Sequence, residues 1–133
     1  TIDFALDNAG VDPSEIDHVN AHAASTPQGD LAEAEAIRKV LGERANQIPV
    51  TSIKGAIGYC MGAAGAIETI AAIKTITDGQ IPPTLNYRNP DPKIGLDIVH
   101  GSARKAEVNV LTKHSFGLGG QNAALVLGRY FPE

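Results

Sequence analysis

The sequence predicts an α/β fold in which helices pack on a mixed sheet of about five strands. Segments with helical apolar spacing alternate with short β-branched runs, and two longer strand-like segments flank a glycine turn near the end. This order of elements is typical of an α/β domain. Apolar residues make up 43% of the chain but aromatic residues only 5%, which predicts a core of Ala, Val, Ile and Leu.

The first half predicts two helices and two buried strands. Residues 2–8 read as a helix that stops at Gly10, and Asp12-Pro13-Ser14-Glu15 has the pattern of a capping box followed by a short helical turn. Residues 18–22 and 48–53 read as strands. Between them a helix begins near Asp30, with an apolar stripe of Leu31, Ala34, Ile37, Val40 and Leu41.

The second half predicts one long helix and a closing pair of strands. A glycine-spaced segment, 55–65, leads into a helix that ends at 78–79 and that we expect to be buried between layers. Its expected inner face is Ile67, Ile70, Ile73 and Ile76. Residues 81–92 are proline-rich and extended, and 96–99 read as an edge strand. Strands at 108–116 and 122–127 flank the turn 117–120, whose glycines permit a tight reversal.

Charge and cysteine content exclude several classes of protein. The net charge is −4 and the 11 Lys and Arg are scattered, which disfavours nucleic acid as a partner. Cys60 is the single cysteine, so an internal disulfide or a cysteine metal cluster cannot form, and a reducing cytoplasm is expected. Glycines and charges interrupt the most apolar stretch, 56–76, so no membrane span is predicted. The chain starts within a helical pattern and without Met, which suggests a fragment.

Four ordered segments carry the chemistry. They are Asn20-Ala21-His22-Ala23-Ala24-Ser25-Thr26-Pro27-Gln28-Gly29-Asp30; Lys54 with Gly58-Tyr59; Gly62-Ala63-Ala64-Gly65-Ala66-Ile67-Glu68; and Ser115-Phe116-Gly117-Leu118-Gly119-Gly120-Gln121-Asn122. In order and spacing they resemble the C-terminal signature of β-ketoacyl synthases, which reads N-A-H-G-T-S-T-P-x-G-D, K-x-x-x-G-H-x-x-G-A-A-G, and N-S-F-G-F-G-G-x-N. The family's Ile-Pro-Pro-Thr-Leu-Asn is also present at 81–86. The resemblance covers nearly the whole chain.

The resemblance implies a thiolase-like half-domain, with residues 1–133 as the C-terminal lobe of a two-lobed enzyme. Such enzymes condense an acyl group with a malonyl thioester on an acyl carrier protein and release carbon dioxide. The nucleophilic cysteine would lie on the N-terminal lobe, which is absent here, and Cys60 does not match its position. The implied partners are that lobe, an acyl carrier protein and a second synthase subunit in a homo- or heterodimer. No cofactor is implied, and the acyl substrate, chain length and fatty acid or polyketide pathway stay open.

By the same resemblance, His22 and Lys54 are catalytic residues. Decarboxylation of a malonyl thioester creates an enolate oxyanion, which two histidine Nε2–H donors would stabilise. His22 matches the first donor, and Lys54 matches a lysine that supports the site electrostatically. Tyr59 stands where the second histidine belongs. A phenol donates one hydrogen bond but carries no positive charge and shuttles no proton near neutral pH, so we expect impaired condensation.

The loops around these residues also depart from the family pattern. Ser25 and Thr26 would lie near the pantetheine arm, or would cap the following helix. Ala23 and Ala24 replace Gly and Thr, and His114 replaces Asn. Phe116 matches the family, while Leu118 replaces the second Phe of F-G-F-G-G, the side chain that gates the acyl pocket.

The counterparts of Asn20, Glu33 and Glu68 help to bind a structural cation in some family members. The remaining ligand position falls on Lys113. We therefore expect no metal, and hypothesise that the Lys113 ammonium replaces it by pairing with Glu33 or Glu68, because a buried carboxylate needs a partner. The alternative is a surface lysine on an edge strand.

Two other functions stay open at this stage. Gly58-Tyr59-Cys60-Met61-Gly62 matches G-x-C-x-G, the strand-to-helix elbow of α/β-hydrolases, with Cys60 as nucleophile and Asp97 followed by His100 or His114 as partners. Against this interpretation, the chain is short for that fold and a lone motif is a weak signal. The other alternative is a non-catalytic partner subunit of chain-length-factor type, with which Tyr59 is compatible.

Overall fold

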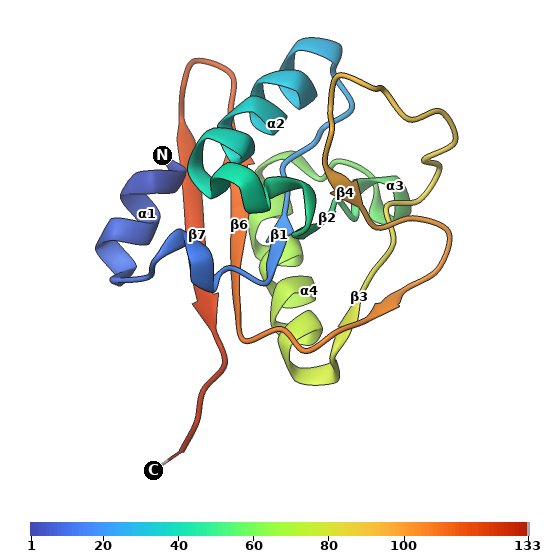
Figure 1. Cartoon of the computed structure of the whole chain (residues 1–133). Coiled ribbons are helices and arrows are strands. Elements are labelled where there is room, and N and C mark those ends of the chain that lie inside the picture. Colours follow the sequence, from blue (N-terminus) through green and yellow to red (C-terminus); the bar gives the residue numbers. More distant parts are fainter. Residues whose placement is uncertain (133) are drawn as a thin grey trace.

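A central sheet with helices on both faces forms the molecule. The computed structural model describes residues 1–132, and its five-stranded sheet has the order β4-β2-β1-β6-β7 (Figure 1). These strands are β1 (His18–Asn20), β2 (Pro49–Thr51), β4 (Asp97–Ile98), β6 (Val110–Phe116) and β7 (Asn122–Gly128). β7 pairs antiparallel with β6 and the other pairs are parallel. The predicted mixed sheet of about five strands is confirmed.

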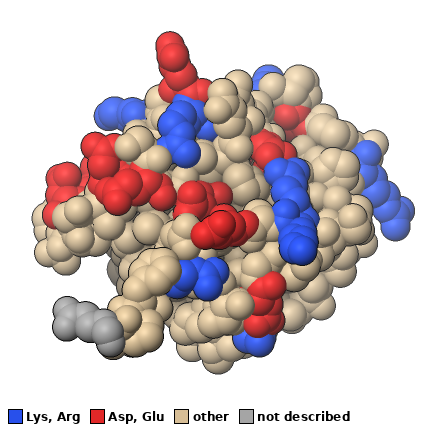
Figure 2. Space-filling view, turned by 60° about the horizontal axis from the view of Figure 1, so that its bottom comes forward, with Lys and Arg blue, Asp and Glu red and all other residues tan. Residues whose placement is uncertain are grey.

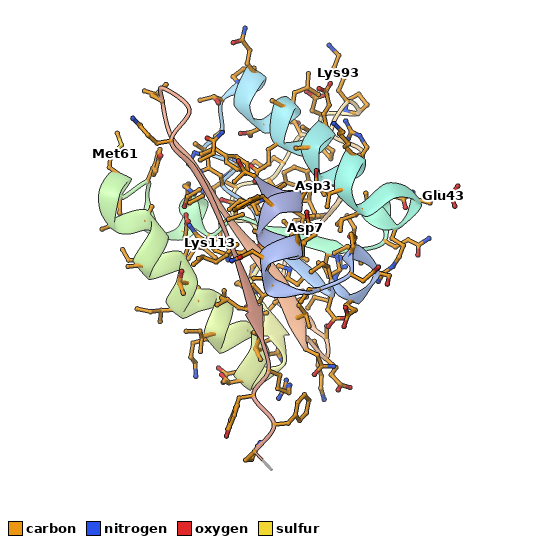
Figure 3. All side chains as sticks on the ribbon, turned by 90° about the vertical axis from the view of Figure 1, so that its left-hand side faces the viewer. Asp3, Asp7, Glu43, Met61, Lys93 and Lys113 are labelled. Atoms are coloured by element: carbon orange, nitrogen blue, oxygen red, sulfur yellow. The ribbon has the colours of Figure 1, made fainter. Side chains whose placement is uncertain are left out.

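The helices form an outer layer on each face of the sheet. α1 (Ile2–Ala9) and α2 (Pro27–Leu41) cover one face, α4 (Ala64–Asp78) covers the other, and the short α3 (Lys54–Ile57) follows β2. The layers are seen side-on in Figure 3. Single 3-10 turns span Pro13–Glu15, Gly42–Asn46 and Met61–Ala63, and a separate two-stranded sheet joins β3 (Gln80–Ile81) to β5 (Arg104–Lys105). The short helix α3 was not predicted.

The predicted signals at the start of the chain are confirmed. α1 ends at Gly10, whose φ of 65° is left-handed and therefore suits glycine. Asp12 and Glu15 form the expected capping box: the Ser14 amide donates to the Asp12 carboxylate and the Asp12 amide donates to Glu15, each at 2.8 Å.

Each face of the sheet has its own apolar core. On the α2 face, residues of α1 and α2 such as Leu6 and Ile37 pack with Val19 of β1. On the α4 face, Ala72 and Ile76 pack with Leu111 of β6. Side chains alternate along a strand, so His114 and Phe116 of β6 point to the α2 face while Lys113 points to the α4 face.

The orientation of α4 differs from the prediction. Its inner side is formed by Ala64, Glu68, Ala72 and Thr75 with Ile76, whereas Ile70 is 63% and Ile73 47% exposed. The helix is apolar on more than one side, so periodicity alone did not distinguish its inner face. Small side chains let the helix approach the sheet closely, and within residues 1–132 no further layer covers its outer side. Residues 1–132 therefore cover this helix on one side only, and its burial between two layers stays a prediction.

The surface agrees with a scattered distribution of charge. On the face in Figure 2, Lys and Arg lie among Asp and Glu and form no continuous basic stripe. Among the helices of residues 1–132, none has both the length and the apolar character needed to cross a membrane.

The buried His18 predicts a loss of stability in acid. Its Nδ1–H donates to the carbonyl of Pro49 at 2.8 Å, and burial lowers the pKa of His18 from 6.5 to about 4. Below pH 6.5 the unfolded chain binds a proton at His18, whereas the folded chain leaves His18 neutral. The contribution of neutral His18 to the free energy of unfolding is therefore complete above pH 6.5 and is lost as the pH falls to about 4.

We expect His18→Gln to remove about 3 kcal/mol of this pH dependence, from 1.36 kcal/mol per pKa unit. Urea unfolding at pH 7 and pH 4 measures it, with the exposed His100→Gln as the matched control. Equal pH dependence in wild type and His18→Gln would contradict the assignment.

Candidate functional site

The predicted catalytic residues meet where the parallel strands end. His22 follows β1, and Lys54 opens α3 just after β2. The Lys54 ammonium donates to the carbonyl oxygen of His22 at 2.5 Å and lies 5.2 Å from the centroid of the Tyr59 ring. The rings of His22 and Tyr59 meet edge to face, with centroids 5.4 Å apart. In open α/β sheets, ligands bind at this end of the strands.

Phe116 completes an aromatic group around His22. Its ring centroid lies 6.0 Å from that of His22 and 5.5 Å from that of His114, on which it stacks. Leu118, by contrast, is 99% exposed at the turn between β6 and β7. The structure thus brings Phe116 to His22 but leaves Leu118 in solvent.

The backbone that carries His22 is held by the carboxylate of Glu33. The amides of His22 and Ala23 donate to its Oε1 and Oε2 at 2.8 and 2.7 Å. One turn earlier on α2, Asp30 accepts the amides of Ser25 and Thr26. Two acids of a single helix therefore fix the loop between β1 and α2.

Ser25 and Thr26 are exposed on this loop, as a substrate-contacting role requires. Thr26 is the N-cap residue of α2, but its hydroxyl makes no capping hydrogen bond. A side chain at Gly29 would collide with the Thr26 hydroxyl. The hydroxyl thus lies against a glycine and is not used by the helix.

A buried ion-pair group lies behind His22, on the α4 side of the sheet. Lys54 pairs with Oε1 of Glu68, and the ammonium of Lys113 is 2.9 Å from Oε2. Lys113 also donates to Ser115 and is 2% exposed. A Cβ at Gly65 would lie 3.8 Å from the Lys113 ammonium, an ordinary contact distance, so the ammonium packs beside the start of α4. Figure 3 shows Lys113 between the sheet and α4.

The three residues suggested as cation ligands do not form one site. Glu33 is engaged on the α2 side, whereas both oxygens of Glu68 face ammonium groups on the α4 side. The fully buried Asn20 amide has no hydrogen-bond partner among residues 1–132. Across that same part of the chain, no group of three acidic, His or Cys residues has the arrangement of a metal site. The donors present do not fit a bound cation.

A cavity of about 480 Å³ opens beside Lys54 and Tyr59. Ser52 and Thr84 line it: the Ser52 amide donates to the Thr84 hydroxyl at 3.1 Å, and the Ser52 hydroxyl to the Ala23 carbonyl at 3.3 Å. Sequence reasoning assigned no role to Ser52, Thr84 or Asp30. Thr84 and Asp30 lie in motifs that resemble the family signature, so the sequence pointed to both of them. Ser52 lies in no such motif.

The electrostatics favour an uncharged His22 and an ionised Glu33. Burial, followed by the Lys54 ammonium, lowers the pKa of His22 against the opposing effect of Glu33 and Glu68. Burial raises the pKa of Glu33, but hydrogen bonds and charge from His114, with the two loop amides, outweigh it and leave that pKa below its ordinary value.

The hydrolase interpretation of Cys60 is wrong. A nucleophile elbow needs a strand before the nucleophile, and residues 54–57 form helix α3 instead. Cys60 then precedes the 3-10 turn Met61–Ala63.

Solved structures define the class of fold. A type II polyketide ketosynthase, in complex with its acyl carrier protein and bound to a hexaketide, matches 98% of this chain with a TM-score of 0.95 and 36% identity, over 32% of its own length. The ishigamide ketosynthase/chain length factor matches with a TM-score of 0.93 and 40% identity, over 98% of this chain and 32% of its own. The fold is that of thiolase-like ketosynthases.

Sequence comparisons give the family. The model for the β-ketoacyl synthase C-terminal domain matches residues 1–88. A chloroplastic 3-oxoacyl-[acyl-carrier-protein] synthase I of Hordeum vulgare is 45% identical over 98% of this chain and 28% of its own length. A 3-oxoacyl-[acyl-carrier-protein] synthase 2 of Mycobacterium bovis is 47% identical over 95% and 30%. The chain therefore belongs to the β-ketoacyl synthase family, and it spans less than a third of the length of these relatives.

The shared Glu68 predicts a large effect of removing its charge. In Glu68→Gln, two buried ammonium groups lose their counter-charge, so we expect the free energy of unfolding to fall by about 3 to 5 kcal/mol. Urea denaturation measures this loss. Adding Lys113→Met to the Glu68→Gln variant removes one of the two unpaired buried charges, so we expect part of the lost free energy of unfolding to be recovered. A double variant no more stable than Glu68→Gln would contradict the shared pairing.

Proposed function

We propose that residues 1–133 form the C-terminal lobe of a β-ketoacyl-[acyl-carrier-protein] synthase and supply half of its active site. The observation that carries this proposal is the meeting of His22, Lys54 and Tyr59 at the strand ends. The reaction is decarboxylative condensation of an acyl and a malonyl thioester. The cysteine that carries the acyl group belongs to an N-terminal lobe.

His22 acts as an oxyanion donor in this proposal. Its lowered pKa keeps the imidazole neutral, and a neutral ring has one N–H. Nδ1 is buried without a partner among the described residues. Placing the proton on Nε2 avoids an unpaired buried N–H and presents a donor to the thioester oxygen, where negative charge develops during decarboxylation.

Tyr59 takes the place of the second donor and weakens the reaction. Its ring lies against both His22 and Lys54, so the phenol replaces the imidazole within the same group. A phenol donates one hydrogen bond and supplies no positive charge. Loss of one oxyanion donor costs about 10²–10³ in rate, so the enzyme is slower than a synthase with two histidines.

The remaining predicted residues contact substrate and partners. Ser25 and Thr26 face the pantetheine arm, and Phe116 with Leu118 borders the acyl chain. The outward isoleucines of α4, Ile70 and Ile73, are exposed apolar surface that the N-terminal lobe covers. An acyl carrier protein delivers the substrate, and a second subunit completes a homo- or heterodimer, as the similar ketosynthase complex and ketosynthase/chain length factor pair suggest. A cytoplasmic location remains a prediction.

Lys113 serves as a fixed internal cation in place of a metal. Its ammonium is buried against Glu68 and Ser115 at the position predicted for a cation ligand. The positive charge that a bound ion would place beside Glu68 is thus carried by a side chain of β6.

A second candidate is a non-catalytic partner subunit. Similarity to a ketosynthase/chain length factor pair and the presence of Tyr59 favour it. The retained His22 and Lys54 favour the enzyme.

Substitution of Tyr59 separates the two candidates. In the full-length protein, we expect Tyr59→His to raise the rate of malonyl-thioester decarboxylation by about 10²-fold, and Tyr59→Phe to lower it. Release of carbon dioxide from malonyl-carrier protein measures the rate. The exposed Tyr130→His is the matched control. No gain in Tyr59→His would support the non-catalytic subunit.

The role of Lys113 predicts how stability responds to cations. We expect the unfolding midpoint of the wild type to be the same in potassium chloride and in choline chloride of equal ionic strength. In Lys113→Ser, the freed Glu68 oxygen and the Asn20 amide can accept an ion, so potassium should stabilise this variant selectively. The exposed Lys74→Ser is the control. Potassium dependence of the wild type would overturn the proposal.

A further inference from the structure

Two residues that depart from the family pattern meet on one carboxylate. Ala23 stands at a Gly position and His114 at an Asn position, and both donate to Glu33. We propose that His114 is a positioning residue: through Glu33 it holds the strained loop 22–25 and offsets the strain that Ala23 introduces. Its catalytic consequence rests on the proposed function of His22, whereas its effect on the loop does not.

The loop is strained immediately after His22. Ala23 has φ 28° and Ser25 has φ 66°, values in the left-handed half of backbone space where side chains other than glycine are disfavoured. Such a conformation persists only where its surroundings hold it. The orientation of the His22 side chain therefore depends on whatever fixes these few residues.

Glu33 restrains the first two residues of this loop, while Asp30 holds Ser25 and Thr26. Glu33 accepts two consecutive backbone amides, from His22 and Ala23, one on each oxygen. Its side chain is 4% exposed, so the carboxylate cannot take further donors from bulk water. A carboxylate in this position holds the loop only if its own orientation is fixed.

His114 supplies that orientation from the opposite side. A carboxylate only accepts, so Nδ1 of His114 must carry the proton in its 3.0 Å contact with Glu33 Oε1. Nε2 lies 3.1 Å from the hydroxyl of Thr112, which fixes the ring plane. The ring is 1% exposed and stacks on Phe116. His114 thus links β6 to α2 and reaches His22 by two routes, through Glu33 and through Phe116.

Hydrogen exchange of the full-length protein tests the effect on the loop. We expect His114→Leu, which removes the donor but keeps an apolar side chain, to speed amide exchange in residues 22–26 about tenfold, as for loss of one hydrogen bond to a charged group. Segments outside the contacts of Glu33 should keep their rates. His18→Leu is the matched control: it also removes a buried histidine of the sheet, but His18 bonds Pro49 and not Glu33.

Relief of strain provides the second measurement. Ala23→Gly in the His114→Leu background should recover most of the lost protection, and more than the same change gives in the wild type. His114→Asn retains an N–H donor, so a smaller local effect is expected; it also replaces the Leu variant if that does not fold. Uniform acceleration along the chain, or equal effects of Ala23→Gly in both backgrounds, overturns the proposal.

Activity separates this inference from the proposed function. If His22 is the oxyanion donor, His114→Leu should lower kcat for decarboxylation of malonyl-carrier protein and leave KM within about twofold, because only transition-state alignment is lost. An inactive wild type would refute the proposed function, and the exchange experiments would still decide the role of His114. An unchanged kcat in His114→Leu with faster exchange in residues 22–26 would refute the catalytic role of His22 and keep the effect on the loop. An unchanged kcat with unchanged exchange in residues 22–26 would overturn the positioning role of His114.

Discussion

A buried carboxylate must be surrounded by donors, and this requirement determines how the site is built. Glu33 and Glu68 each project from a helix toward the sheet, one on each face, and each is met by side chains of β6. The Glu33 carboxylate accepts hydrogen bonds from the backbone amides of the His22 loop. Glu68 forms an ion pair with Lys54, whose ammonium donates a hydrogen bond to the His22 carbonyl. The backbone of His22 is therefore held from both faces of the sheet, and among residues 1–132 neither acid forms a hydrogen bond with its imidazole ring.

Residue patterns predicted the order of elements because local physics decides it. The capping box at Asp12, the glycine stop at Gly10 and the turn between the last strands depend on backbone geometry within a few residues. The inner face of α4 could not be predicted in this way. Isoleucine is more hydrophobic than alanine, so hydropathy favours the isoleucine side of α4 as the inner side. The helix instead packs its smaller residues on the sheet, because they allow a close approach and because Glu68 must be buried there.

The site was predictable to the extent that its motifs resemble those of a known family. His22, Lys54 and Tyr59 were identified from spacing and resemblance, and they lie together. The partners of the two acids were harder to foresee. Both Glu33 and Glu68 were open partners for Lys113, because the sequence does not state which face of β6 meets which helix. Ser52 had no signal, since its role is a hydrogen bond to the backbone of a distant loop.

The alternation of side chains along β6 has an evolutionary consequence. Lys113 and His114 are neighbours in sequence, but Lys113 completes an ion pair with Glu68 on one face of the sheet and His114 a hydrogen bond to Glu33 on the other. Insertion or deletion of one residue in this strand would turn the histidine toward α4, where the lysine now pairs, and would turn the lysine toward α2. The strand can diverge by substitution at either position, but its length is fixed by the two layers that it joins.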